Sequence, residues 1–242
     1  MIAARQIYLG RGGAGGGWVN PYVTDGLVAM WDGEWNAGGG VHDPNSATWN
    51  DLAGTFDASV VGTPSFGDNF ANVNANSYWI IPDTIAPTVL SQNLTAEVVF
   101  SAGDSTILNQ CILAFGPTAS SSRILYLFFG QYPQNKNTNC FWTYKGKQAA
   151  VRPTGSGALG FDIHTTSIVV SSGVFDGYFD GGLTTSGNAG GSTSSWSGIA
   201  QIGKGVNAFD GHIYCVRMYS RPLTSAELDC NHAIDKARFN LP

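Results

Sequence analysis

Residues Phe209 to Phe239 read FDGHIYCVRMYSRPLTSAELDCNHAIDKARF and contain signals for one strand, one turn and one helix. From Gly211 to Tyr219, successive side chains of a strand point to opposite faces, and both faces are largely apolar. The alternation predicts one face made of Ile213, Cys215, Arg217 and Tyr219 and a second made of His212, Tyr214, Val216 and Met218. A strand with two apolar faces is buried on both sides, so we expect it at the centre of a sheet.

The residues after this strand predict a turn followed by a helix. Pro222 has no amide hydrogen to donate, so the ladder of hydrogen bonds should end at Arg221-Pro222. Thr224 and Glu227 have the spacing of a capping box, in which a hydroxyl and a carboxylate bind the free amides of the first helical turn. The helix should therefore start at Ser225. It is the one strong helix signal in the sequence, which favours an all-β domain that closes with one short helix.

This ending resembles the closing segment of LamG-like, concanavalin A-type jelly rolls, in which a final strand of the form F-x-G-x-I-x-x-V-R-x-Y-x-R-x-L-[ST]-x-x-E runs into a short helix. The matching positions are Phe209, Gly211, Ile213, Val216, Arg217, Tyr219, Arg221, Leu223, Thr224 and Glu227. Asp25–Gly33 is similar to the first strand of the family, and Thr48–Gly54 to its Trp-x-Asp-Leu-x-Gly element. The resemblance implies a LamG-type jelly-roll β-sandwich over roughly residues 25 to 241. It implies no single function, because the superfamily contains glycan-binding modules, hydrolases, adhesion domains and spacers.

The length favours one domain preceded by an arm. A chain of 242 residues, 43% of them hydrophobic, can bury one sizeable core. We expect an extended, Gly-rich anchoring arm over residues 1–21 and the sandwich over residues 22–242, because the run Gly10–Gly17 is too flexible to fold alone. The predicted anchoring residues are Ile7, Tyr8, Leu9 and Trp18. A disordered linker is the alternative interpretation of the arm.

The composition excludes some classes of partner. Only 12% of the residues are charged, and the net charge of −5 is accompanied by twelve scattered basic residues. No basic patch is therefore present for a phosphate backbone, and we expect no nucleic-acid partner. No apolar run approaches the roughly 20 residues that span a bilayer, so we expect no membrane partner. The first ten residues lack the apolar core and cleavage site of a secretory signal, so we expect no signal peptide.

The four cysteines leave two interpretations open. Cys111, Cys140, Cys215 and Cys230 are widely spaced and form no Cys-x-x-Cys motif. Cys111 and Cys215 lie in apolar segments and should be small buried side chains. A disulfide between Cys215 and Cys230 would be the most plausible bridge in an oxidising compartment.

Asp32, Asp43 and Asn45 are candidate calcium ligands. They offer hard oxygens in and beside a loop rich in turn-forming residues, and such oxygens are the ligands that calcium prefers. The resemblance also implies that a calcium site is common in the superfamily. The alternative is that these side chains cap turns of their own backbone.

Catalysis by paired carboxylates is not predicted. Enzymes of the laminarinase type on this fold place two glutamates on one strand, about four residues apart. The chain has three glutamates, Glu34, Glu97 and Glu227, and none has a second carboxylate in that register. We therefore expect no enzymatic activity.

Glycan binding is the function that the sequence favours. Sugars are held by aromatic faces, which cover the apolar parts of the ring, and by polar side chains that bind its hydroxyls. The candidate ligand-binding residues are Trp142, Tyr144, Trp196, Tyr132, Asn135 and Asn137. The alternative is that each of these aromatic residues is buried in the core.

The hypothesis for the whole chain is a non-enzymatic decoration or adhesion protein of a virion. The resemblance extends to LamG-like domains in phage structural proteins and bacterial surface proteins, and an uncleaved Gly-rich arm suits assembly on a bacteriophage capsid or tail. The arm would bind other virion proteins, and the sandwich would bind host or environmental glycans. The alternatives are a free-standing bacterial lectin-like module and a glycoside hydrolase, and homo-oligomerisation is left open.

Overall fold

Strand β17 (Gly211–Tyr219) lies in the middle of a large sheet, which confirms the prediction of a central strand. It pairs with β7 (Leu94–Ala102) on one side and with β1 (Leu27–Asp32) and β5 (Ala71–Val73) on the other. The structure is a computed structural model that describes residues 19–63, 65–74, 76–103, 109–117, 124–129, 140–151, 162–188 and 198–242.

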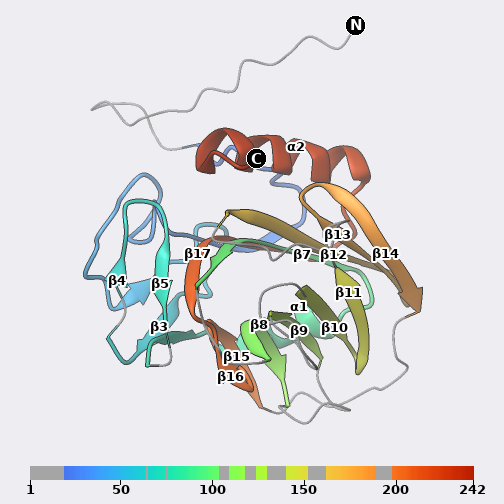
Figure 1. The fold of residues 1–242 in the computed structure, drawn as a ribbon, viewed down its shortest axis with the longest axis horizontal. Helices are drawn as coiled ribbons and strands as arrows, with labels where there is room; N and C mark the ends of the chain where they lie inside the picture. The colour runs from blue at the N-terminus through green and yellow to red at the C-terminus, as the bar shows by residue number, and fades with distance from the viewer. Residues whose placement is uncertain are drawn as a thin grey trace, which may run out of the picture.

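Two sheets stack face to face (Figure 1). Sheet A has eight strands in the order β14 (Gly182–Asn188), β13 (Val174–Phe179), β12 (His164–Ser171), β7, β17, β5 and β4 (Ser65–Phe66), with β1 also beside β17. Sheet B has nine strands in the order β11 (Lys147–Val151), β10 (Cys140–Tyr144), β9 (Leu125–Phe129), β8 (Gln110–Gly116), β15 (Ile199–Ile202), β6 (Tyr78–Ile80), β3 (Ala58–Val61) and β2 (Thr48–Trp49), with β16 (Asn207–Ala208) parallel to β8. All other pairs are antiparallel, so the chain folds as the predicted β-sandwich.

A β-bulge in β17 changes the predicted assignment of side chains to its two faces. Ile213 lies opposite Phe100 and Cys215 lies opposite Val99, so Tyr214 is an extra residue on this strand. Ile213 therefore faces the core between the sheets, whereas Tyr214 and Cys215 both belong to a cluster on the outer face. The prediction holds from Cys215 to Tyr219 and is wrong before the bulge, because the extra residue reverses the alternation.

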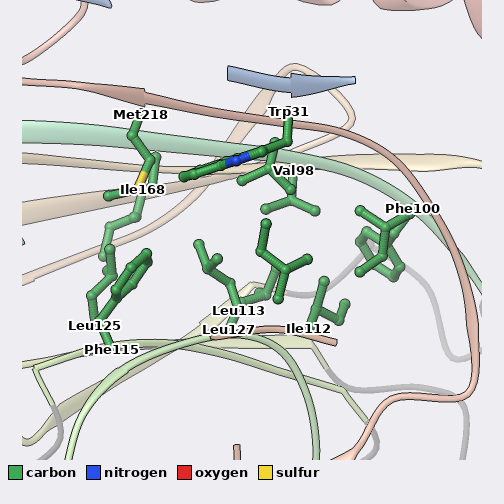
Figure 2. Close-up of a cluster of buried hydrophobic side chains, with 14 of the residues drawn as sticks. Trp31, Val98, Phe100, Ile112, Leu113, Phe115, Leu125, Leu127, Ile168 and Met218 are labelled. Carbon is green, nitrogen blue, oxygen red and sulfur yellow. The ribbon is translucent and has the colours of Figure 1, made fainter. Parts of the chain in front are cut away.

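The core fills the space between the two sheets (Figure 2). Sheet A contributes Trp31, Val98, Phe100, Ile168 and Met218, and sheet B contributes Ile112, Leu113, Phe115, Leu125 and Leu127. Each of these side chains is almost completely buried. Burial of one such side chain contributes about 1.5–3 kcal/mol, so this layer holds the sheets together.

Helix α2 (Ser225–Phe239) starts at the predicted residue and covers the outer face of sheet A (Figure 1). The amide of Glu227 donates to the Thr224 hydroxyl at 3.3 Å, and the amide of Thr224 donates to the Glu227 carboxylate at 2.8 Å, which confirms the capping box. The helix ends at Phe239 and is followed by Asn240, whose φ of 55° is left-handed, as is common after a helix.

One further helical segment was not predicted from the sequence. It consists of a short 3-10 turn, η1 (Asp83–Ile85), and helix α1 (Ala86–Leu90). Five residues are too few to show a helical period, so the sequence gives no clear signal for α1. In the described part of the chain, neither helix has the length and hydrophobicity that a membrane span requires.

The chain approaches the sandwich along α2. The Tyr22 hydroxyl donates to Asp235 at 2.8 Å, and the amide of Val23 donates to the Asn231 side chain at 3.0 Å. The predicted anchoring residues Ile7, Tyr8, Leu9 and Trp18 lie outside the described residues. The division into an arm of residues 1–21 and a domain of residues 22–242 stays a prediction.

Candidate functional site

Two of the predicted sugar-binding residues belong to the core. Trp142 is 0% exposed, and its indole donates to the Thr166 hydroxyl of the opposite sheet at 2.9 Å. Tyr144 is 1% exposed, and its hydroxyl donates to the carbonyl of Ser91. The alternation of β10 points both rings inward, so neither offers a face to a ligand, which corrects the prediction for these two residues. The other candidates, Trp196, Tyr132, Asn135 and Asn137, lie outside the described residues.

The candidate calcium ligands have other partners in the structure. The Asp32 carboxylate is buried and binds the Arg238 guanidinium at 2.7 and 3.0 Å. The Asp43 carboxylate accepts the amide of Asn45 at 2.9 Å, which is the turn-capping alternative. Over the residues that the structure describes, no group of three His, Cys, Asp or Glu side chains is placed to hold a metal ion.

All four cysteines are thiols and take part in no disulfide bond. Cys111, Cys140 and Cys215 are buried, as expected for Cys111 and Cys215, and Cys230 is exposed on α2. The disulfide that was left open between Cys215 and Cys230 is not formed.

A layer of buried charges joins sheet A to α2. Arg217 of β17 binds Glu97 of β7 at 3.0 Å and Asp235 of α2 at 2.8 and 2.6 Å. Asn231 of α2 adds a hydrogen bond of 2.7 Å to Glu97 and one of 2.9 Å to the Tyr219 hydroxyl. Burial raises the pKa of the Glu97 carboxyl, although the Arg217 guanidinium acts in the opposite direction. These contacts are satisfied within the protein, so the layer fixes the helix on the sheet.

A second guanidinium extends this layer towards the first described residues. Arg238 binds Asp32, and it also binds Glu34 at 2.9 Å and the Tyr22 hydroxyl at 2.8 Å. It lies 3.9 Å from the centre of the Trp35 ring, and Arg217 lies 4.0 Å from the centre of the Tyr22 ring. Both arginines are therefore held by carboxylates and by aromatic faces.

The cleft beside this layer is too small for a sugar. It has a volume of about 10 Å³ and is lined by Glu97, Thr165, Ser167, Tyr178, Gly181, Leu228, His232 and Asp235. The Thr165 hydroxyl lies 3.0 Å from Nδ1 of His232, and burial lowers the pKa of this histidine. A space of this size is close to the lower limit for a single water molecule.

The outer face of sheet B is exposed to solvent over β3, β6 and β15. Ser59 of β3 pairs with Ile80 of β6, and Ile80 pairs with Gln201 of β15, so the three form one row across the sheet. Val61 and Tyr78 form the next row. We call this surface, with two residues of the turn after β15, the open patch; its members are Ser59, Val61, Tyr78, Ile80, Gln201, Lys204 and Val206.

The open patch stands on strands whose inward side chains are packed in the core. Ile80 is 43% exposed and Val206 is 40% exposed, whereas the neighbours Trp79 and Ile202 point inward and are buried in the core. The open patch measures roughly 10 Å across its three strands and roughly 7 Å along them, from one row of side chains to the next. On strands β8 and β9 the outer face of sheet B is buried. The buried side chains there, which mark the edge of the open patch, are Cys111, Ala114, Tyr126 and Phe128.

Polar groups lie among the apolar side chains of the open patch. Ser59 is exposed and Gln201 is half-buried, and no hydrogen bond joins their side chains to another residue in the described part of the chain. The Lys204 ammonium lies 4.5 Å from the centre of the Tyr78 ring. Gln201, Ser59 and Ile80 have no distinctive motif, so the sequence offered no signal for them beyond the alternation of their strands.

Comparisons with known proteins give a likeness in fold. The sequence matches no protein-family model and no curated protein. Among solved structures, a Trypanosoma rangeli sialidase in complex with sialic acid is 17% identical with a TM-score of 0.63, over 88% of this chain and 33% of that chain. Domain 4 of AbnA, an extracellular GH43 arabinanase of Geobacillus stearothermophilus in complex with arabinotriose, is 17% identical with a TM-score of 0.58, over 84% of this chain and 97% of that chain. The receptor-binding domain of a botulinum neurotoxin C/D mosaic serotype is 13% identical with a TM-score of 0.63, over 89% and 53% of the two chains.

These matches confirm the fold class and correct one functional prediction. The chain spans about a third of the length of the sialidase chains, so this sandwich occurs within enzymes, which overturns the prediction of no enzymatic activity. That prediction rested on three glutamates, which the structure places in ion pairs with Arg238, Arg217 and Arg221. The absence of a glutamate pair argues only against hydrolysis by two paired carboxylates and leaves other reaction types open.

Proposed function

We propose that the chain is a carbohydrate-binding β-sandwich module and that the open patch of sheet B is its sugar-binding surface. The observation that carries the proposal is the combination of exposed apolar side chains, chiefly Ile80, with the amide of Gln201, which bonds no other described residue and lies on the same face of the sheet. A sugar ring has an apolar face and an edge of hydroxyls, so it needs both kinds of group at this spacing.

The patch is well suited to hold a sugar without moving. Its side chains stand on three hydrogen-bonded strands whose inward residues are packed in the core, so little order has to be gained on binding. Its size of roughly 10 Å by 7 Å fits one or two sugar rings. A shallow site of this kind binds weakly as a single copy, and multivalent display raises its avidity.

Two further points support this function. The AbnA domain that shares the fold is almost entirely covered by the chain and is in complex with arabinotriose. The LamG-like, concanavalin A-type relationship that the closing motif implies belongs to the same proposal, because that superfamily contains glycan-binding modules. A bacteriophage capsid or tail, reached through the arm of residues 1–21, is the proposed setting, and a free-standing bacterial lectin-like module is the alternative.

The test is a glycan array probed with the multivalently displayed protein. We expect binding to at least one class of oligosaccharide, and a loss of about tenfold or more in Ile80→Asp and in Gln201→Ala. Val174→Asp, at an exposed position of β13 in the other sheet, is the matched control and should bind as the wild type does. Unchanged binding by both patch variants, with the fold intact by circular dichroism, would place the sugar elsewhere; silence of the wild-type protein on the whole array would remove the proposed function.

A further inference from the structure

Lys204 stands on a turn that is packed tightly against the sandwich. Gly203 on one side has a φ of 87°, and a Cβ atom there would lie 2.5 Å from the Val73 side chain. Gly205 on the other side would bring a Cβ atom to 2.7 Å from Sγ of Cys111. Side chains at these two positions would therefore push the turn away from the sheets, and their absence lets it lie flat.

Backbone hydrogen bonds hold the same turn in place. The amide of Gly203 donates to the carbonyl of Ile112 at 2.8 Å, and the amide of Phe209 donates to the carbonyl of Gly203 at 2.9 Å. The amide of Val206 lies 3.3 Å from Sγ of Cys111. The backbone of Lys204 at the edge of the open patch is thus held in place by the fold and does not depend on a ligand.

Among the described residues, no carboxylate pairs with the charge of Lys204. Its ammonium contacts the face of the Tyr78 ring, and within the described ranges it takes part in no ion pair. The described arginines behave differently, since Arg217, Arg221 and Arg238 each bind carboxylates. An aromatic face is no carboxylate acceptor, so the N–H donors of the ammonium that point away from the ring remain available to an acceptor.

We propose that Lys204 makes the open patch selective for anionic sugars, which carry a carboxylate or a sulfate group. This inference rests on the proposed function. The other six members of the patch are uncharged, so nothing on it repels an anion. A charge-assisted bond from the ammonium would fix the anionic group at one edge of the patch while the sugar ring covers Ile80 and Gln201.

The test compares pairs of immobilised glycans that differ only in charge. One arm uses carboxylate sugars and the same sugars with the carboxyl reduced, and the other uses sulfated sugars before and after desulfation. Wild-type protein is expected to bind the anionic member about tenfold more tightly, a ratio that falls as salt is added. Lys204→Gln should abolish the preference, so that the variant binds the anionic and the neutral member of each pair equally. Lys236→Gln, on α2 at the other face of the molecule, should keep the preference.

The outcomes distinguish failure of the proposed selectivity from failure of the proposed carbohydrate binding. Equal binding of both members of every pair by the wild type would overturn the selectivity and leave carbohydrate binding intact. A preference for the anionic member that persists in Lys204→Gln would show that another group provides it, which also overturns the inference. Absence of binding to all glycans would overturn both proposals. A preference in only one arm identifies the anionic group as carboxylate or sulfate.

Discussion

At the scale of single residues, Arg217 shows what a sequence can and cannot tell. Its place in the apolar strand from Gly211 to Tyr219 indicates a charge that will be buried. A buried charge needs partners, but Glu97 and Asp235 are 120 and 18 residues away along the chain. No residue near Arg217 in the sequence points to these two carboxylates. The sequence therefore predicts that Arg217 needs a buried partner, but not which residues provide it.

Replacement of this guanidinium should strongly destabilise the protein. Arg217→Met leaves the Glu97 and Asp235 carboxylates buried without their cation, and loss of one partner of such a pair costs about 3–5 kcal/mol in the free energy of unfolding. Urea unfolding of the variant and the wild type measures the difference. Arg221→Met, which breaks a partly exposed pair with Glu227, should cost only about 0–1 kcal/mol. Similar losses in the two variants would contradict this account of the layer.

The candidate site was also missed at the residue scale. Aromatic residues were chosen by type, but type does not give the face of a strand, and Trp142 points inward. Ile80 and Gln201 carry no signature and meet only because β6 and β15 become neighbours in sheet B. To recognise such a patch, one must know which distant strands pair with each other, and a single sequence does not give this information.

At the scale of elements, local signals were read correctly and long-range ones were not. The capping box between Thr224 and Glu227 spans one helical turn, so it could be found before the helix was seen. The bulge at Tyr214 depends on the register between β17 and β7, which involves a segment more than a hundred residues earlier. Prediction therefore succeeded where the interaction is short in sequence.

The same cap makes the stability of α2 dependent on pH. Hydrogen bonds from Arg221 and from Thr224 lower the pKa of Glu227 to about 2, below the value of roughly 4.3 expected in the unfolded chain. A depressed folded-state pKa contributes stability that is fully present above pH 4.3 and is lost as the pH falls towards 2. Glu227→Gln should therefore be less stable than the wild type at neutral pH, and the difference should shrink in this acid range.

Urea midpoints of the two proteins between pH 2 and pH 7 measure this difference. Asp229→Asn, at an exposed position of the same helix, is the control and should show little change. A difference that stays constant down to pH 2 would mean that the charge of Glu227 is not what stabilises the cap.

At the scale of the whole molecule, the two outer faces of the sandwich differ. One carries α2 and its layer of buried charges, and the other carries the open patch. Composition and the closing motif were enough to predict an all-β sandwich with a terminal helix. They could not show which sheet the helix covers, and it is this choice that leaves the patch on sheet B in solvent.

Removal of residues 1–18 tests the proposed arm. The truncated protein should keep its thermal midpoint, because the contacts of Tyr22 and Val23 with α2 remain. If the arm holds the domain on a bacteriophage particle, cosedimentation with particles should be lost while glycan binding persists. A longer truncation that also removes Tyr22 should lower the thermal midpoint, since it exposes Asp235 and one face of Arg217. Truncated protein that still cosediments would contradict the role of the arm.

The contacts of Tyr22 and Val23 with α2 also show on which side of the sandwich the two ends of the domain lie. The helix itself ends at Phe239, and Leu241 packs into the same cluster, so the domain begins and finishes on one side (Figure 1). The segment around Tyr22 and the residues after α2 therefore both lie on the outer side of sheet A. A partner that binds on that side would lie behind sheet A, and the outer face of sheet B, with Ile80 and Lys204, would point away from it.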